Sequence, residues 1–144
     1  MTTQRIATAL SLIGALFIIY VGLSYLIAPV TTASGFGLPA WPDGDAAAFL
    51  NLKGVRDTVS GLLLIALLAA RQRFALGIVT LVIALIPLGD MITVLSWHGS
   101  TAAAFGVHGF TAALVALTGV LLLLERRTVA TDRPTTIEPN PVTA

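Results

Sequence analysis

Residues 6–28 read IATALSLIGALFIIYVGLSYLIA, an apolar run without a charged side chain. A helix needs about 20 such residues to cross a hydrocarbon core roughly 30 Å thick. The alternative is a cleaved secretory signal, for which the small residues Thr31 and Ala33 would supply a cleavage site. The apolar core of such a signal usually has about 7 to 15 residues, which is shorter than this run. The run therefore predicts an uncleaved transmembrane helix that ends at Pro29, because proline denies the next turn a backbone donor.

The rest of the chain also has the composition of a membrane protein. Of its 144 residues, 56% are hydrophobic and 10% are charged, whereas soluble domains carry roughly one quarter charged residues. Three more stretches are long enough to span a bilayer, at residues 47–70, 74–97 and 102–124. We therefore predict an all-α fold, in which an antiparallel bundle of four transmembrane helices forms one domain over residues 1–128. The proline-rich residues 129–144 are expected to form a disordered cytoplasmic tail.

The arginines indicate how the four spans are oriented, because cytoplasmic loops of membrane proteins are enriched in lysine and arginine. In a four-span arrangement one side receives Arg5, Arg71, Arg73, Arg126, Arg127 and Arg133. The loops on the other side hold Asp43, Asp45 and His98 but neither lysine nor arginine. Both termini are therefore expected in the cytoplasm, with the protein in the inner (plasma) membrane. The excess of arginine over lysine suits a bacterial genome rich in GC.

Several kinds of chemistry are disfavoured by the composition. The net charge of +1 and the lack of a basic, aromatic stretch argue against a nucleic-acid partner. Without cysteine, the chain has no disulfides, thiolate nucleophiles or cysteine metal sites. His98 and His108 lack the spacing of a metal motif, and no phosphate-binding glycine loop or nucleophile elbow occurs. We therefore expect no metal and no cofactor, whereas membrane lipid is an expected partner and an oligomer is compatible with the sequence.

Four polar residues lie on one face of the second span. Lys53, Arg56, Asp57 and Ser60 are spaced at i, i+3, i+4 and i+7, so they form one stripe along a helix. The stripe has two interpretations. Lys53 and Arg56 could reach outward to headgroup phosphates, with Asp57 paired to Lys53 along the helix, or the whole stripe could face the interior of the bundle.

Two ionisable residues of the other spans lie at a matching depth. Asp90 lies about seven residues before Trp97, and His108 lies about as far inside the fourth span, so both are about 10 Å deep. Asp90 and the three charges of the second span sum to zero, as a buried set requires, because an unpaired charge in the membrane costs about 2.5 to 3.5 kcal/mol. We therefore expect Arg56 to pair with Asp90, with His108 close to both.

These residues define a candidate site in the outer half of the bundle. The candidates for acid and base catalysis are Asp90, His108 and Asp57. The candidates for ligand binding, two of which come from the first span, are Arg56, Lys53, Ser60, Tyr20 and Ser24. His108 has a structural alternative, in which it only donates a hydrogen bond to a neighbouring helix.

Three short motifs carry a family resemblance. Lys53-Gly54-Val55-Arg56-Asp57 opens the second span, Gly89-Asp90 lies in the third and His108-Gly109 lies in the fourth. Over roughly residues 14–124 the chain resembles a family of small four-span membrane proteins of bacteria and fungi that is catalogued as a domain of unknown function. It is also similar in general plan to DoxX-like and anthrone-oxygenase-like four-helix membrane proteins. The resemblance implies the four-span fold and no activity, because function does not follow from architecture.

Three functions are compatible with the sequence. The leading hypothesis is a protein that binds a lipophilic small molecule between its helices, and it leaves open whether the protein is an enzyme. The alternative is an accessory or structural membrane subunit, in which the charges only lock the helices together. The third is a proton or ion path in an oligomer, although in the cytoplasmic half only Thr80, Thr111 and Thr118 would line such a path. An open cavity at the candidate site would favour the first, and a closed cluster would favour the second.

Overall fold

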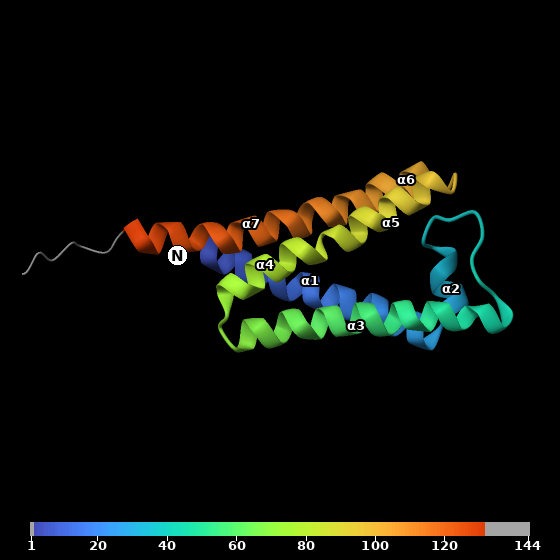
Figure 1. The fold of residues 1–144 in the computed structure, drawn as a ribbon, viewed down its shortest axis with the longest axis horizontal. Coiled ribbons are helices and arrows are strands. Elements are labelled where there is room, and N and C mark those ends of the chain that lie inside the picture. The colour runs from blue at the N-terminus through green and yellow to red at the C-terminus, as the bar shows by residue number, and fades with distance from the viewer. Residues whose placement is uncertain (1, 132–144) are drawn as a thin grey trace, which may run out of the picture.

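The structure is a computed structural model that describes residues 2–131 (Figure 1). Every regular element in this range is helical, which confirms the predicted all-α bundle. In chain order the elements are α1 (Thr2–Ile27), α2 (Pro29–Ser34), η1 (Gly44–Ala47), α3 (Ala48–Ala69), α4 (Arg73–Ile83), α5 (Leu85–Ser96), α6 (Thr101–Ala103), η2 (Ala104–Gly109) and α7 (Phe110–Thr131). The last helix runs past the predicted end of the domain at residue 128. The rest of the predicted tail, residues 132–144, lies outside the described range.

Three helical stretches of the described chain are long and apolar enough to cross a membrane, namely Thr3–Ile27, Arg73–Ser96 and Thr101–Glu125. They correspond to the first, third and fourth predicted spans, and they support a small membrane protein. The second predicted span corresponds to α3, which has 22 residues. α3 does not join this group, because it carries Lys53, Arg56 and Asp57. The crossing of the membrane by α3 therefore stays a prediction.

The third predicted span is interrupted close to its proline. α4 ends at Ile83 and α5 begins at Leu85. Pro87 has no N–H to donate to the carbonyl of Ile83 four residues earlier, which is why the helix breaks here. Ala84 keeps near-helical backbone angles (φ −59°, ψ −22°), so α5 continues close to the direction of α4 (Figure 1).

The helices pack as two pairs, α1 with α3 and α4 with α7 (Figure 1). Glycines allow the first pair to approach closely. A Cβ added at Gly22 of α1 would lie 2.7 Å from the carbonyl oxygen of Gly54 in α3, and one added at Gly61 would lie 2.6 Å from that of Ala15. Small residues at such crossings are common in membrane helices, because they let two backbones come together.

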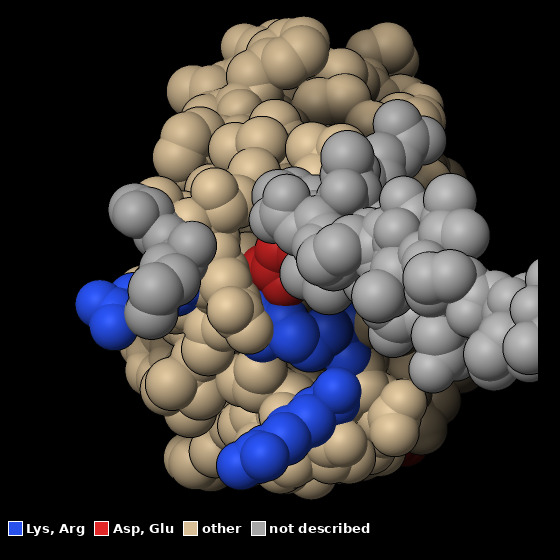
Figure 2. Space-filling view, turned by 90° about the vertical axis from the view of Figure 1, so that its left-hand side faces the viewer, with Lys and Arg blue, Asp and Glu red and all other residues tan. Residues whose placement is uncertain are grey.

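The two pairs converge at one end of the bundle and separate at the other (Figure 1). At the converged end Arg73 of α4 makes a two-pronged ion pair with Glu125 of α7, at 2.6 Å and 2.8 Å, and also donates to the hydroxyl of Thr8 in α1 at 3.0 Å. Basic side chains gather on this end (Figure 2). The core of the bundle lies in the same half, where α1, α3, α4 and α7 contribute Ala7, Ala15, Leu64, Leu76 and Leu122. At the separated end, α2 and the loop after it lie between the pairs.

Candidate functional site

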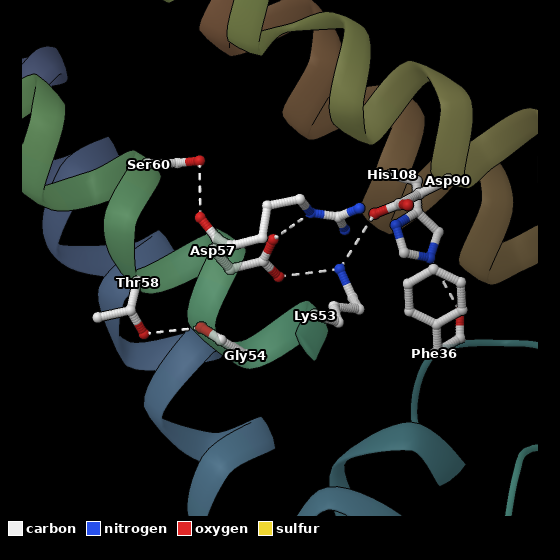
Figure 3. A network of polar contacts seen from close by, with 9 residues as sticks. Phe36, Lys53, Gly54, Asp57, Thr58, Ser60, Asp90 and His108 are labelled. Carbon is white, nitrogen blue, oxygen red and sulfur yellow. Dashed lines mark hydrogen bonds and ion pairs between the residues drawn. The ribbon is translucent and has the colours of Figure 1, made fainter. Parts of the chain in front are cut away.

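The centre of the candidate site is the ammonium group of Lys53, on the face of α3 that turns toward α5. Its Nζ atom lies 2.9 Å from Oδ2 of Asp57 and 3.6 Å from Oδ2 of Asp90 (Figure 3). The Asp57 side chain is 0% exposed, and those of Lys53 and Asp90 are 18% and 23% exposed. One cation therefore bridges two carboxylates from two helices, which compensates charges that would be costly to bury alone.

The predicted pair between Arg56 and Asp90 is corrected by the structure. The Nε atom of Arg56 lies 3.4 Å from Oδ1 of Asp57, and the Arg56 side chain is 54% exposed. The partner of Asp90 is Lys53 instead. The difference follows from the directions in which the two side chains leave α3. Lys53 lies one helical turn before Asp57 on the inner face, whereas adjacent residues such as Arg56 and Asp57 point about 100° apart.

Two aromatic rings outside the predicted site lie near the ammonium group. The ring centroids of Tyr25, in α1, and Phe36, in the loop after α2, each lie 5.3 Å from the Lys53 Nζ atom. A cation within about 6 Å of a ring face is attracted by its electrons. The position of Tyr25 could have been predicted from the sequence, because it continues the buried face of α1 at helical spacing from Ala15 and Gly22. The position of Phe36 could not, since it lies in a loop without a periodic pattern.

Three predicted ligand-binding residues are not brought to Lys53. Tyr20 is 68% exposed on the outside of α1. The Ser24 hydroxyl donates to the carbonyl of Tyr20, and the Ser60 hydroxyl donates to that of Arg56, each at 2.8 Å. Both serines therefore satisfy their hydroxyls within their own helices, as serine often does in an apolar environment.

His108 lies in η2, a single π-helical turn of the fourth predicted span. Its Nε2 atom lies 2.8 Å from the carbonyl oxygen of Phe36, and the centroids of the His108 and Phe36 rings are 4.5 Å apart (Figure 3). A carbonyl oxygen can only accept, so Nε2 carries the proton. The π turn shifts the register of the helix by one residue, a feature frequent at functional sites. His108 therefore contacts Phe36, one of the two residues whose rings lie near Lys53. It lies on the same side of the site as Asp90 (Figure 3), and its predicted interaction with Arg56 and Asp90 stays a prediction.

The loop that carries Phe36 is fastened at a second point. The backbone N–H of Ser100 donates to the carbonyl oxygen of Gly37 at 2.8 Å. Gly37 has a φ of 102°, which glycine adopts without strain. An added Cβ there would lie 2.6 Å from the Cβ of Ala103. The loop is therefore held against the turn between α5 and α6.

We expect the replacement of His108 by alanine to loosen this loop. A hydrogen bond contributes about 1 kcal/mol net, so the amide of Ser100 should exchange its hydrogen about fivefold faster. Hydrogen exchange followed by mass spectrometry would measure the change. The matched control is His98→Asn, because His98 is exposed and has a φ of 55°, which asparagine tolerates. Equal exchange rates of the Ser100 amide in the wild type and in His108→Ala would show that the hydrogen bond from His108 to Phe36 does not hold the loop.

A pocket of about 110 Å³ opens beside Lys53. Helices α1, α2 and α3 and the intervening loop line it with Tyr25, Ala33, Phe36, Leu38, Trp41, Pro42, Leu50 and Lys53. An engineered cavity of about 150 Å³ is known to hold benzene. The pocket is smaller than that cavity, so it has room for a polar group and part of a small ring, and its lining is mostly apolar with Lys53 as the charged residue. Within residues 2–131, no three His, Asp or Glu side chains gather as metal ligands.

A comparison with protein-family models finds one match. The model described as a domain of unknown function (DUF4267) matches residues 15–122. The match includes every residue that contacts Lys53 as well as the pocket and His108. No curated protein and no solved structure matches the chain significantly.

Proposed function

We propose that this chain, which belongs to the DUF4267 family, binds the polar end of a lipophilic small molecule in the pocket beside Lys53. One observation carries the proposal. The Lys53 side chain, whose ammonium group two carboxylates share, lines a pocket whose other walls are mostly apolar. Binding pockets for small molecules commonly combine apolar walls with one or a few polar groups that orient the ligand.

The charges of the site favour a neutral acceptor over an anion. Lys53 has three N–H donors, one of which donates to Asp57 at 2.9 Å, while Asp90 forms an ion pair at 3.6 Å without a hydrogen bond. Together with Arg56 these residues have no net charge, so a negatively charged ligand would leave the site with a net negative charge. A carbonyl or hydroxyl oxygen can accept from a remaining donor without that cost.

The walls of the pocket favour a ligand with a ring or a short chain next to its oxygen. Tyr25, Phe36 and Leu50 supply apolar surface beside the ammonium group. The volume is too small for a whole lipid. The remaining hydrocarbon of the ligand would extend past Trp41, which is partly exposed, toward the membrane interface where tryptophan is enriched.

The proposal includes four transmembrane spans with both termini in the cytoplasm of the bacterial inner membrane. Arg5 near the start of α1 and Arg71 and Arg73 at the turn between α3 and α4 support this topology. Figure 2 shows basic side chains gathered at one end of the bundle. α3 then crosses the membrane with the charges of Lys53 and Asp57 compensated inside the bundle. An oligomer and bound membrane lipid are compatible with this topology.

Reporter fusions test the topology. A fusion after Trp41 should report the outer side, and a fusion after Arg127 should report the cytoplasm, because the arginines gather on one side only. A fusion after Arg71 serves as the control and should agree with the fusion after Arg127. A cytoplasmic signal from the Trp41 fusion would overturn the four-span arrangement.

Fluorine NMR tests the binding with 4-fluorophenol, a single ring with one hydroxyl group. Its signal should broaden with the purified protein in detergent, relative to empty micelles. Fluorobenzene, which lacks the hydroxyl, should bind about tenfold more weakly, since a hydrogen bond to a charged group contributes about 1.5 to 3 kcal/mol.

Two variants make this test specific. Ala33→Leu should abolish the broadening, because Ala33 is buried and lines the pocket. The control Ala66→Leu, on the exposed side of α3, should bind as the wild type does. Thermal unfolding checks that both variants fold. No broadening above that of empty micelles would refute the proposal.

The structural-subunit alternative has one observation in its favour, which is the complete burial of Asp57 within a network that joins α3 and α5. It predicts that 4-fluorophenol does not bind and that Ala33→Leu raises the stability of the protein by filling the pocket. The ion-path alternative receives no such support, because the buried polar side chains of the described chain other than Asp57 and His108 are the hydroxyls of Ser11, Thr80 and Thr118, none of which is charged.

A further inference from the structure

Lys53 is the sole lysine of the sequence, in which all other basic side chains except histidine are arginines. Arginine forms the ion pair at the opposite end of the bundle, between Arg73 and Glu125. The two side chains differ in one chemical respect, because lysine can lose its proton and act as a nucleophile and arginine cannot. The position that lines the pocket therefore carries the one side-chain amine of this chain.

Building on the binding site proposed above, we propose that Lys53 captures a lipophilic aldehyde as a protonated imine, with Asp57 and Asp90 as counter-ions. The Lys53 side chain lines the pocket and is 18% exposed, so an aldehyde held in the pocket lies next to it. The carboxylates at 2.9 Å and 3.6 Å would flank the iminium cation as they flank the ammonium cation.

The reaction balances without an oxidant or a reductant. Asp90, the more distant and more exposed carboxylate, accepts a proton from the Lys53 ammonium group. The free amine attacks the aldehyde carbon, a C–N bond forms, and a proton moves from nitrogen to oxygen to give a carbinolamine. Asp90 then returns its proton to the hydroxyl group, which leaves as water. The products are one protonated imine and one water molecule, so the charge of the site does not change.

Because the Lys53 nitrogen must keep its positive charge, an aldehyde is favoured over an ester or a thioester as the substrate. An ester or thioester would convert Lys53 into an uncharged amide, which would remove the nearer of the two cations beside the buried Asp57, at considerable cost. An imine keeps a cation next to Asp57 and between the rings of Tyr25 and Phe36, which lie at equal distances from Nζ. The pocket volume further favours an aldehyde over a ketone, because an aldehyde has only one substituent beyond hydrogen.

The test uses benzaldehyde and cyanoborohydride, which reduces a protonated imine to a stable secondary amine. The protein carries Arg71→Lys, which adds an exposed reference amine at the turn between α3 and α4. Peptide mass spectrometry then compares the two sites within one molecule. Lys53 should gain the benzyl group at least about tenfold faster than the reference amine, because the pocket holds the aldehyde next to Nζ.

Variants and the binding probe separate the possible results. Ala33→Leu should lower the labelling of Lys53 to the rate of the reference amine, while Ala66→Leu should leave it unchanged. Asp90→Asn should slow the labelling by a larger factor than it weakens the binding of 4-fluorophenol. If 4-fluorophenol binds and Lys53 reacts no faster than the reference amine, the imine is ruled out and the binding site stands. If neither molecule interacts with the pocket, both proposals fail.

Discussion

Replacing Lys53 with methionine should lower the free energy of unfolding by about 3 to 5 kcal/mol, because it leaves two carboxylates in the bundle without their shared cation. Asp57 is the more costly of the two, since its side chain is fully buried. Methionine has a similar length and keeps the contacts of the aliphatic stem. The expected loss is thus electrostatic, and unfolding in mixed micelles with increasing SDS would measure it.

Two further variants distinguish the loss of the cation from a loss of packing. Arg56→Met should cost less than about 1 kcal/mol, because Arg56 is half exposed and contacts Asp57 only at 3.4 Å. Lys53→Met combined with Asp57→Asn should cost clearly less than the sum of the single changes, since the second change removes the stranded charge. Additive costs would show that Lys53 and Asp57 do not stabilise one another.

Much of the fold could be predicted because membrane helices leave strong periodic and compositional signals. The apolar run of residues 6–28 is long enough to require a helix, and the α4–α5 break follows from the missing donor of Pro87. The spacing of Lys53 and Asp57 placed both on one face of α3, and the structure confirms their pairing. These are local properties, which a single stretch of sequence determines.

The rest of the site depends on how separate segments meet. Spacing along α3 does not determine which basic side chain reaches Asp90 on another helix, so the sequence predicts Arg56 as the partner where the structure has Lys53. Depth in the membrane predicts Tyr20 as a site residue, although the buried face of α1 contains Tyr25. Phe36 depends on the path of a loop that His108 and Ser100 hold, and no periodicity describes such a path.

The crossing of α1 and α3 leads to a second strong effect, because it places Tyr25 next to Lys53. An alanine Cβ at Gly22 would lie 2.5 Å from the backbone nitrogen of Thr58 and 2.7 Å from the carbonyl oxygen of Gly54. Both are backbone atoms, so no side-chain rotation can relieve the overlap and the helices must move apart. Gly22→Ala should therefore lower the free energy of unfolding by about 1 to 3 kcal/mol.

Gly14→Ala provides the matched control in the same helix, because a Cβ at Gly14 would have no atom within 4 Å. It should be neutral or stabilising by about 0.5 to 1 kcal/mol, since glycine weakens helix interiors relative to alanine. Separation of α1 from α3 also moves Tyr25 away from the Lys53 Nζ atom, so Gly22→Ala should weaken the binding of 4-fluorophenol while Gly14→Ala should not. If both variants unfold and bind as the wild type does, the close crossing of α1 and α3 does not determine the geometry of the site.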